Sequence, residues 1–346
     1  MTLAVLIAWI KSAITFGTVI MLGAIGEIVT EKSGNLNLGV PGVMYLGGIA
    51  SLAGAFFYES ACKNAGVTPM AWLCIVIALI CALAAGLLGG LIYSFLTITL
   101  RANQNVTGLT LTIFGSGVAN FFGGSLVKLA GGVGQISVAS TSAAFRARLP
   151  FATSLGQIGE VFLDYGWMVY VAILLAVLAH LLLKKTRVGL NLRAVGESPA
   201  TADAAGINVT RYKYFATCGG AAIGALGGMF YVMDYIKGTW ANDGSIESLG
   251  WLAVALVIFT TWKPLNAIWG SYLFGFCYWL YAYIPKEISA SLSASMGLYK
   301  STYLQWLYKM IPYIVTLIVL IVVSLRKKRE NQGPGSLGLA YFREDR

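Results

Sequence analysis

The sequence predicts an all-α integral membrane protein, a polytopic bundle of about nine transmembrane helices, with eight to ten also compatible. Of its 346 residues, 58% are hydrophobic and only 11% are charged, whereas soluble domains carry roughly 25% charged residues. The formal net charge is +10. No basic patch is interleaved with aromatic residues, so this excess indicates cytoplasmic loops and excludes a nucleic-acid surface.

Nine apolar segments are candidate membrane spans, because a spanning helix needs about 20 mostly apolar residues. The third is the clearest, since no charged residue lies between Lys63 and Arg101. The second follows Pro41 and Gly42 and the seventh is short, so each can be a half-helix or a re-entrant segment. The nine segments are 4–25, 40–58, 70–98, 105–127, 166–183, 213–234, 248–262, 264–284 and 304–325.

Basic residues in short connections set the predicted orientation, because cytoplasmic loops carry an excess of Lys and Arg. Two basic clusters are separated by four predicted spans and are both assigned to the cytoplasm. By alternation, residues 26–42 are also cytoplasmic, whereas 128–165, 285–303 and the N-terminus lie outside. A re-entrant second segment would reverse the N-terminal assignment. The clusters are Lys184, Lys185, Arg187, Arg193, Arg211 and Lys213, and then Arg326, Lys327, Lys328 and Arg329.

Small residues recur at four-residue spacing on two predicted spans. Gly220, Gly224 and Gly228 form one series, and Gly86 and Gly90 form another. Glycine faces let membrane helices approach closely. The series predict tight helix packing, with a sliding surface as the alternative.

The connection 186–214, here called the coupling loop, contains a short predicted helix. Ser198 can cap free N–H groups, and Pro199 suits the first helical position. Residues 200–205 favour helix, and Gly206 is a natural stop. A small rigid element projecting from a basic cytoplasmic loop suits docking into a groove on a cytoplasmic partner.

The coupling loop resembles that of permease subunits of ABC importers, in the class that handles branched-chain amino acids, simple sugars and nucleosides. The family pattern is close to G-x-N-L-R-A-V-G-E-x-P-x-A-A-x-x-A-G-I-x-V. The resemblance implies a coupling helix that contacts a separate ATPase subunit, with contact residues Arg193, Glu197, Ser198, Pro199, Asp203 and Gly206. The matching residues are Gly189, Asn191, Leu192, Arg193, Ala194, Val195, Gly196, Glu197, Pro199, Ala205, Gly206, Ile207 and Val209.

Residues 26–42, the N-terminal motif, carry a second family pattern close to G-E-x-x-x-E-x-S-G-x-x-N-L-G-x-x-G. The chain departs from the family where a G-x-E-G arrangement is usual, since residues 40–42 are Val-Pro-Gly. Breakers at Gly39, Pro41 and Gly42 start a new helix whose free N–H groups can meet a polar ligand group, near Asn37. The matching residues are Gly26, Glu27, Glu31, Ser33, Gly34, Asn37, Leu38, Gly39 and Gly42.

The resemblance extends from about Gly17 to Ser324, and 128–165 and the segment after Arg329 do not add to it. We therefore expect one transmembrane permease domain, 1–329, and a cytoplasmic C-terminal tail, 330–346. Branched-chain or sugar permeases share these motifs, but the variant present is most similar to the nucleoside and simple-sugar branch.

The chain has no nucleotide-binding motif of its own, because it contains no Gly-Lys pair and hence no G-x-x-x-x-G-K-[ST]. We expect no enzymatic activity and no cofactor in this chain, with ATP and Mg used by the partner ATPase. The five cysteines show no C-x-x-C spacing, so no metal site is expected. A proton- or sodium-coupled carrier, the main rival, needs ionisable residues at membrane depth, and candidates are few: Lys11, Asp234, Lys309 and His180. A passive channel is a further rival.

Amides and hydroxyls on the fourth predicted span are candidates for a substrate pathway. Asn105, Thr112 and Asn120 are seven or eight residues apart and are expected on one helical face. Such groups suit nucleosides or sugars, and Phe114 can stack on a ring. Bonding of these amides to neighbouring helices is the alternative. With the N-terminal motif, the candidates are Asn37, Asn103, Asn105, Thr112, Phe114 and Asn120.

On the outside, the segment 234–247 is acidic and aromatic, and Asp234, Trp240, Asp243 and Glu247 are candidates for docking a substrate-binding protein; an ordinary solvated loop is the alternative. The expected setting is the bacterial cytoplasmic (inner) membrane. The expected partners are the ATPase, a second permease subunit of the same or a related sequence, the extracytoplasmic binding protein and the lipid bilayer. The predicted substrate is a nucleoside, followed by a sugar such as ribose or galactose, and then a branched-chain amino acid.

Overall fold

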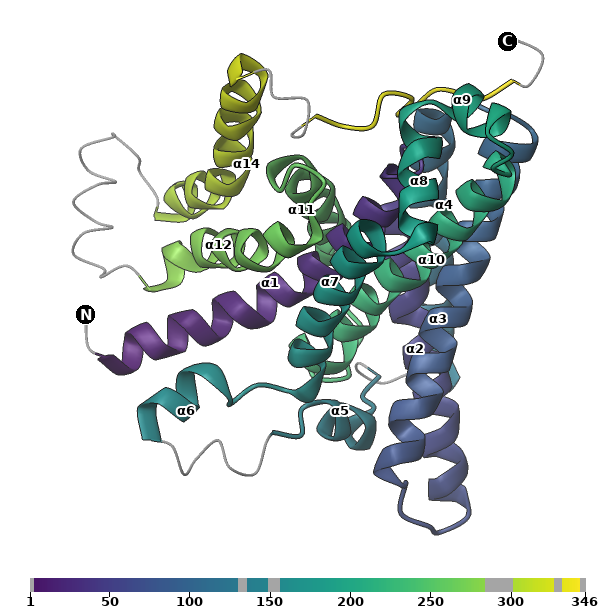
Figure 1. Ribbon diagram of the computed structural model, residues 1–346. Helices are drawn as coiled ribbons and strands as arrows, with labels where there is room; N and C mark the ends of the chain where they lie inside the picture. Colours follow the sequence, from purple (N-terminus) through teal and green to yellow (C-terminus); the bar gives the residue numbers. More distant parts are fainter. Residues whose placement is uncertain (1–2, 130–135, 149–155, 284–300, 327–331, 343–346) are drawn as a thin grey trace.

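The computed structural model describes residues 3–129, 136–148, 156–283, 301–326 and 332–342, and these form helices joined by short connections (Figure 1). Each of the nine predicted segments is a helix. They are α1 (Leu3–Glu31), α2 (Val40–Asn64), α3 (Ala71–Ser94), α4 (Gln104–Leu129), α7 (Trp167–Lys185), α10 (Val209–Phe230), α11 (Ser245–Phe259), α12 (Pro264–Tyr283) and α14 (Ser301–Arg326).

Six of these helices are long and apolar enough to cross a membrane: α1, α2, α3, α4, α7 and α10. One turn of π-helix extends α3 (η1, Phe95–Thr99) and another extends α10 (η3, Tyr231–Tyr235). Helix α11 has only 15 residues, about 22 Å at the helical rise, which is less than the roughly 30 Å of hydrocarbon. The predicted nine spans are therefore supported as nine helices, and six of them qualify as spans by length and composition.

Residues 40–58, which could have been a half-helix or a re-entrant segment, instead belong to one long helix. Helix α2 begins at Val40, with Pro41 in its first turn, and runs without a break for 25 residues. That length is about 37 Å, enough to cross the hydrocarbon layer.

Glycines on α10 and α3 allow the central helices to touch backbone to backbone. A Cβ atom built on Gly228 would meet the main chain of Met44 on α2, and one on Gly26 of α1 would lie 2.8 Å from the Gly224 nitrogen. On α3, a Cβ on Gly86 or Gly90 would collide with α10. The small-residue series therefore serve close helix packing in this conformation, as predicted.

The segments that connect the helices contact one another at the two ends of the bundle. At one end, Lys11 of α1 forms an ion pair of 2.7 Å with Asp164, and the hydroxyl of Thr141 donates to Glu59 at 2.7 Å. At the other end, the N-terminal motif meets the coupling loop and residues 332–342, which we call the C-terminal strap. The described parts of residues 26–42 and of the coupling loop therefore share one end, and Lys11, Glu59, Thr141 and Asp164 share the other, as the expected alternation requires of them. Following the predicted orientation, we call the end with the basic coupling loop the cytoplasmic end and the opposite one the outer end.

Three further helices were not predicted: α5 (Ala139–Phe145), α6 (Gly156–Phe162) and α8 (Arg187–Glu197). The first two lie at the outer end, within the stretch 128–165 that was expected to lie outside. Three sequence predictions concern residues that lie wholly or mostly outside the described part of the chain. They are the outside placement of 285–303, the part of the predicted outside segment that holds glycines 131, 132 and 134, and the basic residues 327–329.

Candidate functional site

The predicted coupling helix is present as α9 (Pro199–Ala204). Ser198 is its N-cap, and the Ser198 hydroxyl accepts a hydrogen bond from the Thr201 amide at 3.4 Å. Pro199 occupies the first turn, and Gly206 follows the helix with φ of +81°, a conformation that favours glycine. The start and stop signals in the sequence were therefore correct.

Helix α8 precedes α9 and was missed, although the sequence contains a signal for it. The Thr186 hydroxyl accepts from the Gly189 amide at 3.0 Å, which is N-cap geometry. Helix α8 buries Leu192 and Val195 and exposes Leu190, at 58%, and Arg193. The two short helices together form an exposed, rigid coupling surface of about five turns.

The coupling loop and the N-terminal motif, which carry the two family patterns, lie in direct contact. Gly196, at the end of α8, packs so closely on Lys32 and Gly34 that a Cβ on Gly196 would meet the Lys32 carbonyl oxygen. Burial lowers the pKa of the Lys32 ammonium, and the nearby Glu197 carboxylate opposes that shift. Helix α8 is thus in direct contact with the chain immediately after α1.

The C-terminal strap crosses this junction and bonds to both sides of it. The Ser336 amide and hydroxyl both donate to the Gly196 carbonyl, at 3.0 and 2.6 Å. The Gly338 amide donates to the Gly34 carbonyl at 3.1 Å. The strap therefore fixes the coupling loop onto the N-terminal motif.

The strap also reaches two of the predicted coupling residues. The Tyr341 hydroxyl donates to the Asp203 carboxylate at 3.0 Å, and the Gly335 amide donates to the Glu197 carboxylate at 3.4 Å. Arg193, Glu197 and Gly206 are exposed, whereas Ser198, Pro199 and Asp203 are half-buried. All six lie on one continuous segment at the cytoplasmic end.

The polar residues of the N-terminal motif are buried and bonded to one another and to neighbouring helices. The Glu27 carboxylate, 2% exposed, accepts a hydrogen bond from the backbone N–H of Asn37 at 3.0 Å. The Asn37 side chain accepts from Gly39 at 2.9 Å, and Asn35 donates to Thr217 of α10 at 2.9 Å. The charged and amide groups of this otherwise apolar region therefore serve to fold the turn between α1 and α2.

Two aromatic residues complete this polar cluster. The indole N–H of Trp262, just after α11, donates to the buried Glu31 carboxylate. The Tyr93 hydroxyl of α3 donates to the Leu36 carbonyl at 2.5 Å. The turn at 32–39 is therefore held by α3, α10 and the end of α11 together.

The predicted pathway residues differ in burial. Thr112 is buried and donates to the Leu38 carbonyl at 3.0 Å, so it packs on the N-terminal motif. Asn103 caps α4 by accepting from the Val106 amide at 3.1 Å. Asn105, Phe114 and Asn120 are exposed on the outer surface of α4 in the single chain. Asn37 is buried in the turn described above.

The predicted docking residues are also divided by burial. Asp234 and Trp240 are 9% and 5% exposed, so they contribute to the loop from inside. Asp243 is exposed and accepts two hydrogen bonds from Ser245, while Glu247 is half-buried in the first turn of α11. Asp243 and Glu247 are thus the pair at the surface of the outer end.

The ionisable residues named for a carrier are mostly engaged elsewhere. Lys11 pairs with Glu160 and Asp164, and Lys309 lies 5.0 Å over the Trp306 ring, with two tyrosine rings at 5.4 Å. Asp234 has one carboxylate oxygen without a hydrogen-bond partner among the described residues. No group of three His, Cys, Asp or Glu side chains in the described residues could hold a metal ion.

Comparison with known proteins places these features in a family. Residues 9–320 match the family described as branched-chain amino acid transport system / permease component. The chain belongs to this permease family. No solved structure gave a significant match to the permease.

Three relatives cover nearly the whole permease. It is 29% identical over 97% of both chains to a putative glucose ABC transporter permease protein, TsgC13, of Haloferax volcanii. It is 28% identical over 90% of both chains to the guanosine ABC transporter permease protein NupQ of Bacillus subtilis. It is 30% identical over 92% of both chains to the nucleoside ABC transporter permease protein NupC of Lactococcus lactis. These are permease subunits of ABC transporters, and the family implies an ATPase and a substrate-binding protein as partners.

Sequence reasoning missed the residues that join the two patterns of the permease. Tyr93 lies in an apolar run and Trp262 follows two threonines at the end of one, and nothing in their spacing marks them as partners of Glu31 and Leu36. The strap carries a weak signal, the run Gly333-Pro334-Gly335-Ser336, which is typical of a turn. Its docking site could not be inferred because the contact spans 140 residues of sequence.

Proposed function

We propose that this permease is the transmembrane subunit of an ATP-driven importer of nucleosides, located in a bacterial cytoplasmic membrane. A separate ATPase subunit would bind ATP and Mg, and this chain, residues 1–329 with the cytoplasmic tail 330–346, would carry out no covalent chemistry. The observation that carries the proposal is the capped, exposed pair α8–α9, packed on the N-terminal motif at Gly196 and held there by the strap. Two of the three relatives above are named for nucleosides or guanosine.

Transport follows alternating access in this proposal. Closure of the ATPase pair on nucleotide would push on the exposed face of α8–α9, which includes Arg193 and Glu197. The push reaches α1 through the Gly196–Lys32 contact, and it reaches α10 through the chain itself, since α10 begins five residues after α9 ends. Both helices lie in the middle of the bundle, so they can tilt their neighbours with them.

The substrate pathway runs along the exposed face of α4 in this proposal, between the chain and a second permease subunit. Asn105 and Asn120 supply amide groups on this face, and the Phe114 ring, 50% exposed, can stack on a base or a sugar. Neutral donors and acceptors suit an uncharged, hydroxyl-rich substrate. Thr112 fixes α4 to the N-terminal motif, Asn103 caps the start of α4, and Asn37 holds the turn that Thr112 contacts.

At the outer end, we assign the docking of a substrate-binding protein to the surface around Asp243 and Glu247. Asp234 and Trp240 would support this surface from within, where Trp240 donates to Asn242. Two carboxylates at a loop surface favour a partner with basic residues at the matching positions.

A sugar importer is the second candidate, and the glucose-named relative favours it because it covers 97% of the chain. Uptake of labelled guanosine, uridine, ribose, glucose and leucine separates the candidates in cells with and without the gene, before and after ATP depletion. Gene- and ATP-dependent nucleoside uptake is the expected result. Uptake of sugar alone would replace the substrate and keep the importer. Uptake that survives ATP depletion and collapses with the proton gradient would favour a stand-alone carrier.

A further inference from the structure

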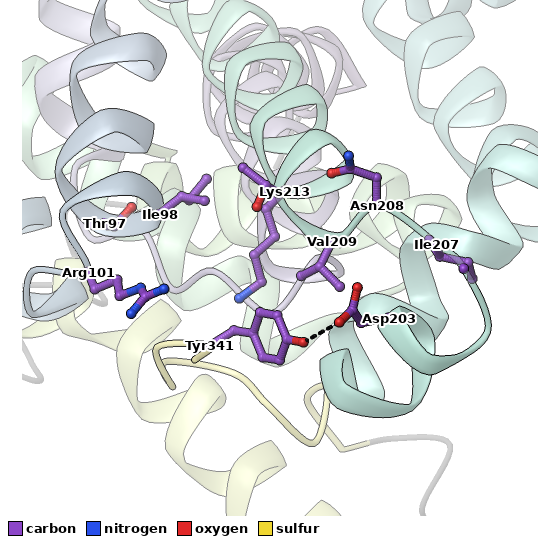
Figure 2. Close-up of a pocket in the computed structure, with 11 residues that line it drawn as sticks. Thr97, Ile98, Arg101, Asp203, Ile207, Asn208, Val209, Lys213 and Tyr341 are labelled. Atoms are coloured by element: carbon purple, nitrogen blue, oxygen red, sulfur yellow. Dashed lines mark hydrogen bonds between the residues drawn. The ribbon is translucent and has the colours of Figure 1, made fainter. Parts of the chain in front are cut away.

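A cavity of about 440 Å³ opens at the cytoplasmic end of the permease, beside the coupling helix. The proposed transport cycle does not use it. Figure 2 shows that its wall comes from four separate segments. Arg101 follows η1, Asp203 lies on α9, Lys213 lies on α10 and Tyr341 lies on the C-terminal strap.

Lys213 is the residue that marks this cavity as a site. It is 3% exposed, and its ammonium has no hydrogen-bond or ion-pair partner among the described residues. Figure 2 shows the amine directed into the cavity, toward Arg101 and Tyr341. A buried charge without a partner is strongly unfavourable. An anion in the cavity would supply the missing partner.

The rest of the wall suits phosphate oxygens. The Arg101 guanidinium, 4.6 Å above the Phe342 ring, adds a second positive charge with a fork of N–H donors. Helix α10 begins at Val209 in the wall, and a helix N-terminus attracts phosphate through its free N–H groups and dipole. Among the lining residues that the structure describes, Asp203 is the only acid, and its carboxylate is engaged by the Tyr341 hydroxyl. Two cations therefore face one carboxylate.

We propose that this cavity binds a phosphate group, with Lys213 and Arg101 as its charged contacts. The phosphate can come from the headgroup of an anionic phospholipid or from a soluble phosphate compound of the cytoplasm. Leu100 and Phe215, on the segments that form the wall, are 58% and 57% exposed, as expected of side chains that face lipid. The site thus lies at the boundary between the membrane and the cytoplasm. An occupant would tie α9, α10 and the strap to one another.

Binding is tested on the purified full chain, without reference to transport, so its failure and that of the proposed function are distinguishable. Native mass spectrometry counts phosphatidylglycerol molecules retained from nanodiscs, and calorimetry with inorganic phosphate measures the soluble source. Lys213→Met removes the charge and keeps an apolar stem. Arg211→Gln is the matched control, because Arg211 is exposed on the same helix and does not line the cavity.

The expected result is binding of one of the two probes by the wild type, weakened about tenfold or more in Lys213→Met and unchanged in Arg211→Gln. Lysine-dependent phosphatidylglycerol retention identifies a lipid source, and lysine-dependent phosphate binding identifies a soluble one. Should Lys213→Met fail to fold, Arg101→Gln replaces it, since Arg101 is exposed, and the same weakening is expected. No binding by the wild type, or equal binding by the lysine and arginine variants and the wild type, would overturn the proposal.

Discussion

The Ser336 hydroxyl donates a 2.6 Å hydrogen bond to the carbonyl oxygen of Gly196. Through this bond and the neighbouring one from Gly338 to Gly34, the strap holds the coupling loop against the N-terminal motif. The two most specific sequence patterns of the chain are therefore parts of one structural unit. Four predictions follow from this unit and from the face of α4.

Gly196→Ala should separate α8 from the N-terminal motif. Its Cβ would meet the Lys32 carbonyl oxygen and lie 3.1 Å from the carbonyl carbon, and both are backbone atoms that cannot simply rotate away. Overpacking of this kind costs about 1–3 kcal/mol. Thermal unfolding of the purified chain measures the loss. Gly219→Ala is the control, because a Cβ there has open space, and equal effects of both variants would contradict the contact.

Glu27→Ala should destabilise the turn between α1 and α2. The variant leaves the buried backbone N–H of Asn37 without its acceptor, and a buried unsatisfied donor costs about 1–3 kcal/mol. Glu27→Gln keeps a side-chain oxygen at this position and should retain most of the stability. Chemical or thermal unfolding of both variants compares them. A glutamine variant as unstable as the alanine one would show that the hydrogen bond to Asn37 is not what matters.

Glu197→Lys should separate ATP hydrolysis from transport. Glu197 is exposed at the coupling surface, and a reversed charge at a protein interface weakens the contact by roughly tenfold or more. In the assembled transporter, ATP hydrolysis should continue while nucleoside uptake falls, with normal membrane insertion by immunoblot. Glu197→Gln distinguishes loss of charge from repulsion. Normal uptake per ATP hydrolysed in the lysine variant would remove Glu197 from the coupling surface.

Gly117→Leu tests the face of α4. A Cβ on Gly117 meets no atom within 4 Å, and the residue is exposed between Phe114 and Asn120. The fold of the single chain should therefore keep its unfolding temperature, while a bulky group in the proposed pathway should lower uptake by about tenfold. Gly219→Leu, on a different helix with equal space, serves as the comparison. Full uptake by Gly117→Leu would mean that this face meets lipid.

The helices and the short coupling helix could be predicted because their signals are local. Apolar length predicted nine segments, each of which is a helix, although only six of these helices are long and apolar enough to cross a membrane. Ser198, Pro199 and Gly206 predicted both ends of α9, which the structure confirms. Local signals do not say which helix side faces a neighbour. Asn105, Thr112 and Asn120 were expected to share a face by their spacing, but the spacing did not show that Thr112 is buried and bonded to Leu38 while the two asparagines are exposed.

The contacts that build the site could not be predicted because they join distant parts of the chain. Lys213 was counted as a basic residue flanking a loop, yet it is buried in a cavity wall. Its burial depends on where η1 and the strap lie, and neither position is encoded near residue 213. Only the packed arrangement shows which cations are free to meet solvent.

The strap also has a consequence for how the protein is made. Residues 332–342 leave the ribosome after every described helix has been synthesised. The Gly196 carbonyl therefore has no hydrogen bond from the strap until Ser336 has been translated. Until then, α8 and α9 are less firmly attached to the rest of the chain. A chain interrupted before Ser336 would contain all of these helices and still lack the contact that holds α8 in place.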